Sequence, residues 1–312
     1  MEREIITWLK SIFPGQPPLL VGIGDDAAVL EIGFSRLVVT TDAIVDGVHF
    51  ETADHSWQRI GHKSVAVNLS DLAAMGATPL AIVIALVLPI GTTIEQVRQL
   101  YVGISEICER WQVSIAGGDT NFSTGPLTIS ATAMGVLRAD QQPWLCCGAQ
   151  VGDAILVSGS FGGSILTKHL DFEPRCDLAR DIGNRFAVHA ATDVSDGLLF
   201  NLGVILRASD CGADLDLSAI PISAAAHQLA SAAADHQSAL WHALYDGEDF
   251  ELILVVDREQ ANVIMADPRL ANQLTRIGTV TESLGIRGRE LKGNVKVLDD
   301  HGFTHGQTDN LS

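Results

Sequence analysis

Residues 63–79 read KSVAVNLSDLAAMGATP, and this stretch says most about the fold. Apolar side chains recur at helical spacing, with Leu72 and Met75 among them, whereas Asn68, Ser70 and Asp71 interrupt the apolar series. A carboxylate so close to a core is costly unless it is paired or bound to a metal. The stretch therefore predicts a largely buried helix that carries Asp71 towards a functional site. The alternative is an ordinary helix with one polar face.

Strand-like and helical segments alternate on both sides of this helix. We expect helices over residues 1–13, 56–75, 93–111 and 198–209, and strands over residues 36–41, 81–88, 114–116, 127–137, 154–158, 213–217 and 250–256. The first of these strands is expected to stop at Asp42. This mixture predicts an α/β and α+β fold. Because the pattern is interrupted at residues 141–143, we predict an N-terminal α/β domain that binds metal and ATP over residues 1–140. An α+β domain would then cover residues 141–312.

Composition narrows the class of protein. The chain has 312 residues, of which 47% are hydrophobic and 19% charged, so a sizeable core is expected. Its formal net charge of -18 argues against nucleic acid and anionic membranes as partners. The longest apolar run, residues 81–88, is too short to span a bilayer and is expected to form a buried strand. The five cysteines are scattered without a Cys-x-x-Cys pair, which argues against disulfides and zinc and favours a cytoplasmic protein.

Five further acidic segments stand at turns beside expected strands or helices. They are GIGDDAAV at residues 22–29, TTD at 40–42, GGDT at 117–120, DVSDGL at 193–198 and DGEDFE at 246–251. Each segment alone reads as an ordinary turn, and Ser195 or Asp196 could simply cap a helix. Together they predict carboxylates that gather around magnesium ions and hold ATP for phosphoryl transfer. Neither a Walker loop nor a Gly-x-Gly-x-x-Gly segment occurs in the sequence.

These segments, in this order, resemble the signature segments of the thiamine-monophosphate kinase family. The segment NLSDLAAMGA is shared with the wider superfamily of aminoimidazole ribonucleotide synthetase. The resemblance implies a two-domain fold whose N-terminal domain contributes strands to a barrel-like interface in a homodimer. It implies direct transfer of the ATP γ-phosphoryl group to thiamine monophosphate, which gives thiamine diphosphate with several Mg²⁺ ions and no nucleophilic side chain.

The resemblance also assigns site residues by position. The expected magnesium ligands are Asp26, Thr40, Thr41, Asp42, Asp71, Asp119, Asp193 and Asp196. The expected ATP contacts are Tyr101, Gly118, Asp119 and Ser195. The expected contacts of thiamine monophosphate are His49, Glu248 and Phe303.

The chain departs from the family at one ATP contact. Cys146 stands where an arginine is expected, and Arg138 is the nearby arginine that could substitute for it. Two other interpretations therefore stay open. One is another ATP-dependent enzyme of the superfamily with a different acceptor, and the other is a paralogue that binds nucleotide and metal without turnover.

Overall fold

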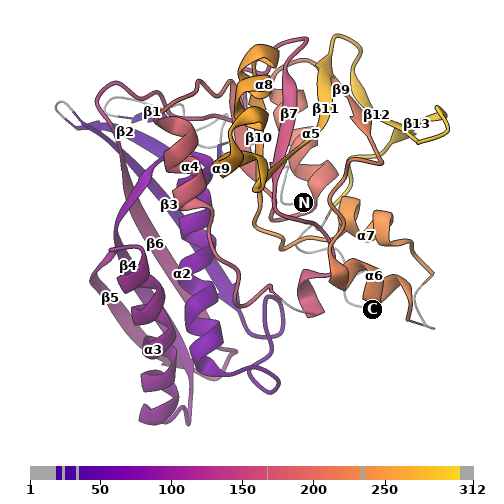
Figure 1. Cartoon of the computed structure of the whole chain (residues 1–312). Helices are drawn as coiled ribbons and strands as arrows, with labels where there is room; N and C mark the ends of the chain where they lie inside the picture. The colour runs from indigo at the N-terminus through magenta and orange to yellow at the C-terminus, as the bar shows by residue number, and fades with distance from the viewer. Residues whose placement is uncertain (1–18, 23–24, 33–34, 167, 233–235, 303–312) are drawn as a thin grey trace.

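The strands form two separate sheets. The computed structural model describes residues 19–22, 25–32, 35–166, 168–232 and 236–302, and the helix expected over residues 1–13 lies outside them. One sheet uses strands from the first half of the chain, and the other uses strands from the second half (Figure 1). A division of the chain near residue 140 would fall between them and stays a prediction. No helix among the described residues is long and apolar enough to cross a membrane.

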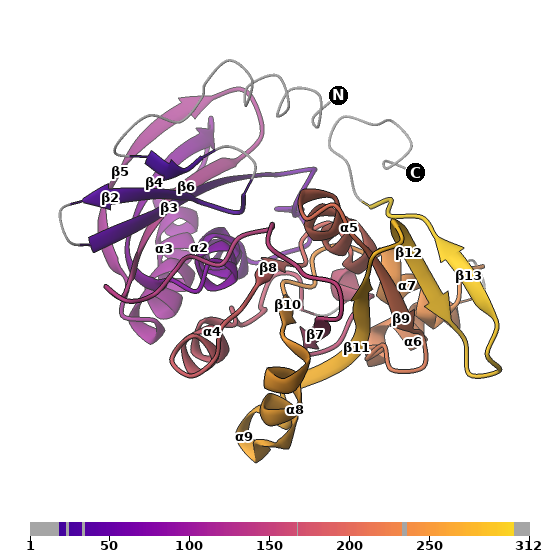
Figure 2. The same ribbon diagram turned by 90° about the horizontal axis from the view of Figure 1, so that it is seen from above.

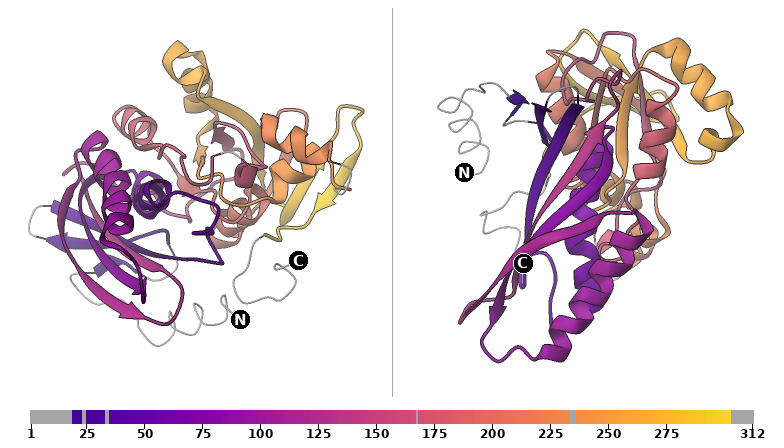
Figure 3. Two further views of the ribbon diagram at one scale, coloured as in Figure 1. Left: turned by 90° about the horizontal axis from the view of Figure 1, so that it is seen from below. Right: turned by 90° about the vertical axis from the view of Figure 1, so that its left-hand side faces the viewer.

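The first sheet has the strand order β1-β2-β3-β6-β4-β5. Its neighbouring strands are antiparallel except for β4 and β5, which are parallel. The strands are β1 (Leu19–Val21), β2 (Ala28–Ile32), β3 (Ser35–Val45), β4 (Thr78–Pro89), β5 (Ser114–Ser123) and β6 (Thr128–Leu137). Helices α2 (Trp57–Ala74) and α3 (Ile94–Arg110) pack on one face of this sheet (Figures 1 and 3).

The second sheet has the order β13-β12-β9-β11-β7-β10-β8. Its strands are β7 (Ala154–Ser158), β8 (Ala190–Asp193), β9 (Gly212–Asp216), β10 (Leu252–Val256), β11 (Leu274–Thr281), β12 (Gly285–Arg289) and β13 (Val295–Leu298). Its helices are η1 (Ser164–Leu166), α4 (Cys176–Gly183), α5 (Leu198–Ala208), α6 (Ala224–Ala230), α7 (Ala239–Tyr245), α8 (Arg258–Ala266) and α9 (Pro268–Ala271). Strand β8 is the edge of this sheet that contacts α2.

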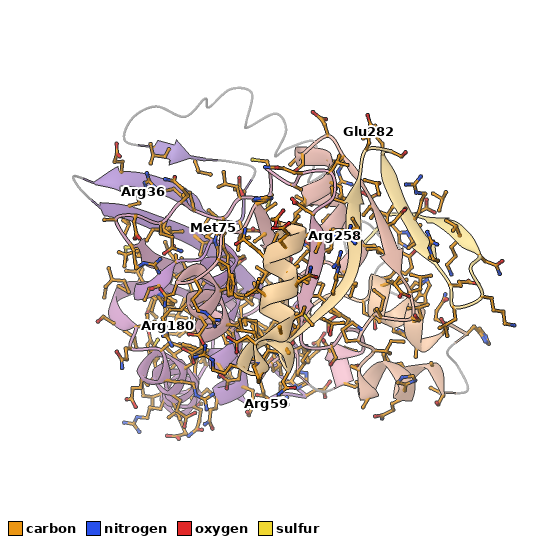
Figure 4. The ribbon with its side chains drawn as sticks, turned by 45° about the horizontal axis from the view of Figure 1, so that its top comes forward. Arg36, Arg59, Met75, Arg180, Arg258 and Glu282 are labelled. Atoms are coloured by element: carbon orange, nitrogen blue, oxygen red, sulfur yellow. The ribbon has the colours of Figure 1, made fainter. Side chains whose placement is uncertain are left out.

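Helix α2 is the element that joins the two halves. Ser56 caps its N-terminus by accepting a hydrogen bond from the Arg59 amide, 3.3 Å away. The helix contacts β3 and β6 on one side and α4 and β8 on the other, and Figure 2 shows it between the two halves. Met75, labelled in Figure 4, ends the helix and is fully buried. Because α2 is covered on both sides, polar residues in its second half face protein.

Close helix packing fixes where α3 crosses α2. A side chain at Gly103 would clash with the backbone carbonyl of Gln58, so glycine permits the contact. The crossing therefore lies at the first turn of α2, whereas Asp71 is in its last turn, roughly 20 Å further along at 1.5 Å per residue.

Several local predictions need correction. Strand β3 continues through Asp42 to Val45, and β5 continues through the glycine pair to Ser123, because both strands pair along their whole length. Strand β4 is not buried on both faces, since its buried and less buried residues alternate. Helix α5 begins after Gly197 without a side-chain cap, so neither Ser195 nor Asp196 caps it. Helices α2, α3 and α5 and strand β6 form close to their predicted ranges.

The second face of the first sheet carries no described helix (Figure 3). Registered residues on this face include Thr41, Thr132 and Val83 in one row and Ala43, Ser130, Ala85 and Asp119 in the next. Strand β5 is exposed on both faces at every residue except Ser123. We call this surface, with the edge strand β5, the outer face.

Candidate functional site

Five carboxylates from distant parts of the chain meet beside the end of α2. The central one is Asp71 of α2, whose Oδ2 accepts a hydrogen bond from Thr40 Oγ1 of β3 at 2.5 Å. Asp193, the last residue of β8, accepts a hydrogen bond from the Ser70 hydroxyl. The electrostatic neighbours of these two groups are Asp26, Asp42 and Asp196. We call Asp26, Asp42, Asp71, Asp193 and Asp196 the carboxylate cluster.

Strand register explains which hydroxyl joins the cluster. Successive side chains of a strand point to opposite faces, so Thr40 and Asp42 face α2 while Thr41 faces away. The Thr41 hydroxyl instead lies on the outer face, 2.9 Å from both Ala131 O and Thr132 Oγ1. The side chain of Thr41 therefore does not meet the cluster in the chain as described.

The side chain of Asp26 contacts residues from later in the chain, Cys146 and Thr192. Its Oδ1 accepts a hydrogen bond from Thr192 Oγ1 at 2.9 Å, and Cys146 Sγ lies 3.4 Å from its Oδ2. The neighbouring Asp25 accepts a hydrogen bond from the Cys146 amide at 2.7 Å. One donor atom from each of Asp25, Asp26 and Cys146 lies within 4.8 Å of the others. These contacts attach the segment before β2 to the second sheet.

The cluster is electrostatically unfavourable without a cation. Burial, followed by the charges of Asp42, Asp193 and Asp26, raises the pKa of Asp71 well above its ordinary value. Burial, followed by the charge of Asp26, also raises the pKa of Asp193 well above its ordinary value. Burial raises the pKa of Asp26 to about 7, although the hydrogen bond from Thr192 opposes the change. Burial also raises the pKa of Asp42. Bound cations would reverse these shifts.

The donor atoms fit hard divalent cations. Carboxylate and hydroxyl oxygens are the ligands that such ions prefer. Asn68 lies one turn before Asp71 on α2, and its buried Oδ1 has no hydrogen-bond partner among the described residues. The Cys146 thiol is a poorer ligand, because burial and then the Asp26 charge raise its pKa far above the ordinary value and keep it protonated. The cluster therefore suits oxygen-coordinated ions.

A second group of residues lies at the turn before β10. Lys63 of α2 donates hydrogen bonds from Nζ to Glu248 Oε1 at 2.7 Å and to the backbone oxygen of His49 at 2.8 Å. His169 Nδ1 lies 3.3 Å from Glu248 Oε2. The Glu248 amide donates to Ser195 O at 2.6 Å, so this group adjoins the turn that holds Asp196. The structure thus brings His49 and Glu248 together through Lys63.

Three expected ATP contacts occupy separate places. Ser195 donates from its hydroxyl to Asp196 Oδ2 at 3.2 Å. Gly118 pairs with Ile84 in the row that contains Asp42, and a side chain there would clash with the Ile84 carbonyl. Tyr101 is half-buried on α3, near the crossing with the first turn of α2. Phe303 lies outside the described residues.

Asp119 does not join the cluster within one chain. It is exposed on the outer face, in the row of Ala43, three strands away from β3. Strand spacing puts this separation at roughly 14 Å. Its carboxylate accepts from the Thr120 amide at 2.9 Å and from Asn121 Nδ2 at 2.7 Å.

Sequence reasoning missed Lys63, Ser70 and Thr192 as members of these groups. Lys63 and Ser70 interrupt the apolar helix as Asp71 does, and that signal could have identified them. Nothing in the sequence singles out Thr192. Arg138, the nearby arginine, donates to Gly183 O at 3.0 Å and to Asn184, so it is engaged with the end of α4.

Comparison with known proteins places the chain in a family. The family model described as "AIR synthase related protein, N-terminal domain" matches residues 24–137. The model of the corresponding C-terminal domain matches residues 150–289. A thiamine-monophosphate kinase of Rhodopirellula baltica is 43% identical over 317 residues, which cover 99% of this chain and 98% of the relative. The counterpart from Buchnera aphidicola subsp. Schizaphis graminum is 32% identical and covers 91% of this chain and 92% of its own length.

Solved structures agree with this placement. A structure described as AaThiL complexed with AMPPCP and TMP matches with a TM-score of 0.84 at 26% identity, over 97% of this chain and 96% of that one. The thiamine-monophosphate kinase of Stenotrophomonas maltophilia K279a matches with a TM-score of 0.73 at 33% identity, over 91% and 95% of the two chains. The chain therefore belongs to the AIR synthase related family and, within it, to the thiamine-monophosphate kinases.

Proposed function

We propose that the chain uses ATP and Mg²⁺ to phosphorylate thiamine monophosphate to thiamine diphosphate by direct in-line transfer. The observation that carries this proposal is the carboxylate cluster, where oxygen ligands from β3, α2 and β8 converge. Support comes from the related structure described as a complex with AMPPCP and TMP. In this reaction, an oxygen of the acceptor phosphate bonds to the γ-phosphorus of ATP. The bond between the γ-phosphorus and the β,γ-bridging oxygen breaks, and ADP leaves with that oxygen.

The cluster's own residues provide positioning rather than a reactive group. Thr40 and Ser70 donate hydrogen bonds to Asp71 and Asp193 and so orient these carboxylates before substrates arrive. Mg²⁺ ions held by Asp26, Asp42, Asp71, Asp193 and Asp196 would neutralise charge on the transferred phosphoryl group. A phosphate acceptor is already ionised, so the reaction needs no general base. This account assigns no role to a cysteine nucleophile.

The proposal assigns His49 to the binding of the acceptor. Its Nδ1 accepts a hydrogen bond from the Val45 amide at 3.1 Å, which leaves the proton of the neutral ring on Nε2. An Nε2–H group is a donor for a phosphate oxygen. Glu248 stands beside it with its charge balanced by Lys63.

The ATP side of the proposal rests on Gly118, Asp119, Ser195 and Tyr101. Gly118 and Asp119 lie near the edge of the first sheet, and Ser195 lies beside the cluster. Arg138, the arginine near Cys146, is bonded to the end of α4. The Cys146 amide is already directed at Asp25, so the Mg²⁺ ions held by the carboxylate cluster would provide most of the positive charge on this side.

Magnesium should stabilise the protein more at pH 8 than at pH 6. Between the ordinary carboxylate pKa of 3.8 and about 7, the folded metal-free chain holds more protons than the unfolded chain. The cluster's contribution to stability is thus full below about pH 4 and is lost as the pH rises through 7. The Mg²⁺ concentration is held at 100 times the dissociation constant measured at pH 8. At this concentration, Mg²⁺ is expected to raise the melting temperature by roughly 5–10 °C at pH 8 and by less at pH 6. Thermal melts with Na⁺ at matched ionic strength are the control, and equal shifts at both pH values would contradict the account.

We propose that the outer face forms a homodimer. Edge strands are rarely left exposed in monomers, yet β5 is exposed at every residue except Ser123. Pairing of this face with a second copy would cover β5 and would bring Asp119 against another subunit. Ala85→Asp, at an exposed residue beside Asp119 on the outer face, is therefore expected to convert a dimer to a monomer in light scattering. Leu284→Asp, at a 75% exposed apolar residue in the turn before β12, should leave the dimer intact. A monomeric wild-type protein would refute this part of the proposal.

One assay separates this function from its alternatives. The purified chain is incubated with ATP, Mg²⁺ and thiamine monophosphate, and thiamine diphosphate is measured. Product formation is expected. ATP hydrolysis stimulated only by another acceptor would favour a different enzyme of the superfamily, and ATP binding without turnover would favour a non-catalytic paralogue. A cytoplasmic location is part of the proposal, because the reaction consumes ATP and the five cysteines are free.

A further inference from the structure

Lys63 is a buried cation that the proposed mechanism uses only to balance the charge of Glu248. Its side chain is 0% exposed, and burial lowers its pKa although the Glu248 charge opposes the change. Lysine is rarely buried unless it is paired. Its hydrogen bonds go to the Glu248 carboxylate and to the backbone oxygen of His49, the two residues that we assign to the acceptor.

On one side, Lys63 holds a segment that is already rigid. Asp46 accepts hydrogen bonds from the Thr52 amide at 2.9 Å and from the Thr52 hydroxyl at 2.6 Å, which closes the loop around His49. The amide of His49 donates to Val45 O at 3.0 Å. The ammonium group of Lys63 therefore ties the backbone of a preformed loop to α2.

On the other side, Lys63 holds a strained residue. Glu248 has a φ of +63°, a left-handed conformation that residues other than glycine rarely adopt. Burial would raise the pKa of Glu248, but the contact of His169 with its carboxylate and the Lys63 charge outweigh it and lower the pKa. Glu248 is thus kept ionised in one orientation. Strain of this kind persists where surrounding contacts fix a functional geometry.

We propose that Lys63 is a positioning residue for acceptor binding. It holds the Glu248 carboxylate against the His49 loop, and it balances the Glu248 charge so that a phosphate monoester can approach. This inference rests on the proposed function. Because Lys63 Nζ is enclosed and bonded to both partners, it acts through them and not on the substrate.

A second ion pair provides a matched control. Lys168 donates from Nζ to Glu251 Oε1 at 3.1 Å, in the same acidic segment as Glu248, but its other hydrogen bond goes to Ser160 O at 3.2 Å. Lys168→Met removes a lysine–glutamate pair without touching the His49 loop. If Lys63 were only a structural pair, the two lysine variants would behave alike.

The experiment measures KM for thiamine monophosphate and for ATP in Lys63→Met, Glu248→Gln, the double variant and Lys168→Met. Lys63→Met is expected to raise the KM for thiamine monophosphate at least tenfold and to change the KM for ATP less than twofold. In the Glu248→Gln background, Lys63→Met should raise the KM for thiamine monophosphate by less than a further threefold, because its effect passes through Glu248. Lys168→Met should leave both KM values within twofold of wild type.

Binding of thiamine monophosphate to the Mg²⁺–AMPPCP complex by calorimetry gives a readout without turnover. Equal losses for both substrates, full additivity of the two substitutions, or a Lys168→Met variant that matches Lys63→Met would each overturn the inference. If Lys63→Met does not fold, the double variant is used in its place, because it leaves neither charge of the pair without its partner. The KM for thiamine monophosphate of the double variant is then compared with that of Glu248→Gln. A wild-type chain that makes no thiamine diphosphate would instead refute the proposed function, and the calorimetry would still report on Lys63.

Discussion

Asp71→Asn is expected to lower kcat/KM for thiamine diphosphate formation by about 10³-fold, or ~4 kcal/mol of transition-state stabilisation. The change removes the central carboxylate of the cluster while keeping the size of the side chain and a hydrogen-bonding partner for Thr40. It also removes repulsion with Asp42 and Asp193. The variant should therefore melt at a higher temperature than wild type without metal and gain little from Mg²⁺.

The control for this prediction is Asp177→Asn. Asp177 has a side chain that is 64% exposed and pairs with Arg180 within α4, so its loss should change neither rate nor Mg²⁺ response. Steady-state rates across a Mg²⁺ titration, together with thermal melts, measure both effects. A near-normal rate of Asp71→Asn at limiting Mg²⁺ would show that Asp71 is not a ligand.

Glu251→Ala is expected to cost about 3–5 kcal/mol of folding free energy, because it removes the buried carboxylate of an ion-pair network and leaves two half-buried cations without that partner. Glu251 is 2% exposed. It accepts hydrogen bonds from Arg175 Nε and Nη2, both at 2.6 Å, from Ser158 Oγ at 2.6 Å and from Lys168 Nζ at 3.1 Å. Burial would raise the pKa of Glu251, but the bonds from Arg175 outweigh it and keep the carboxylate ionised.

The melting temperature of Glu251→Ala should fall by roughly 10 °C, as read by calorimetry or circular dichroism. Glu290→Ala is the matched control, since Glu290 makes an exposed pair with Lys296 at 3.5 Å that is worth about 0.5 kcal/mol or less. A Glu251→Ala variant as stable as Glu290→Ala would mean that the buried network does not stabilise the second half of the chain.

Periodicity in the sequence identified seven of the strands and helices α2, α3 and α5, but it missed the other described elements. Alternating residues identified β6, and helical spacing identified α2 and α3. Strand ends were less predictable, because pairing with a neighbour can carry a strand past a local turn signal. Strand β5 shows this, since its pairing with β4 continues through Gly117 and Gly118. The division of the chain near residue 140 stays a prediction.

The candidate site was predictable as a set of aspartates but not as a geometry. The sequence treats Thr40 and Thr41 alike, whereas register puts one hydroxyl on Asp71 and the other on the outer face. Asp119 has the same local signal as Asp42, yet it lies three strands away from β3. Lys63 was missed because its partner Glu248 is 185 residues away in sequence. Such pairings arise from tertiary packing, which local patterns do not encode.

The most direct test of the account follows the γ-phosphoryl group itself. The chain is incubated with thiamine monophosphate and ATP labelled with ³²P at the γ-position, with Mg²⁺ or with excess EDTA, and the products are separated. The account predicts label in the terminal phosphate of thiamine diphosphate, dependent on Mg²⁺ and lost in Asp71→Asn. Undiminished transfer in EDTA, or label released only as inorganic phosphate, would contradict it.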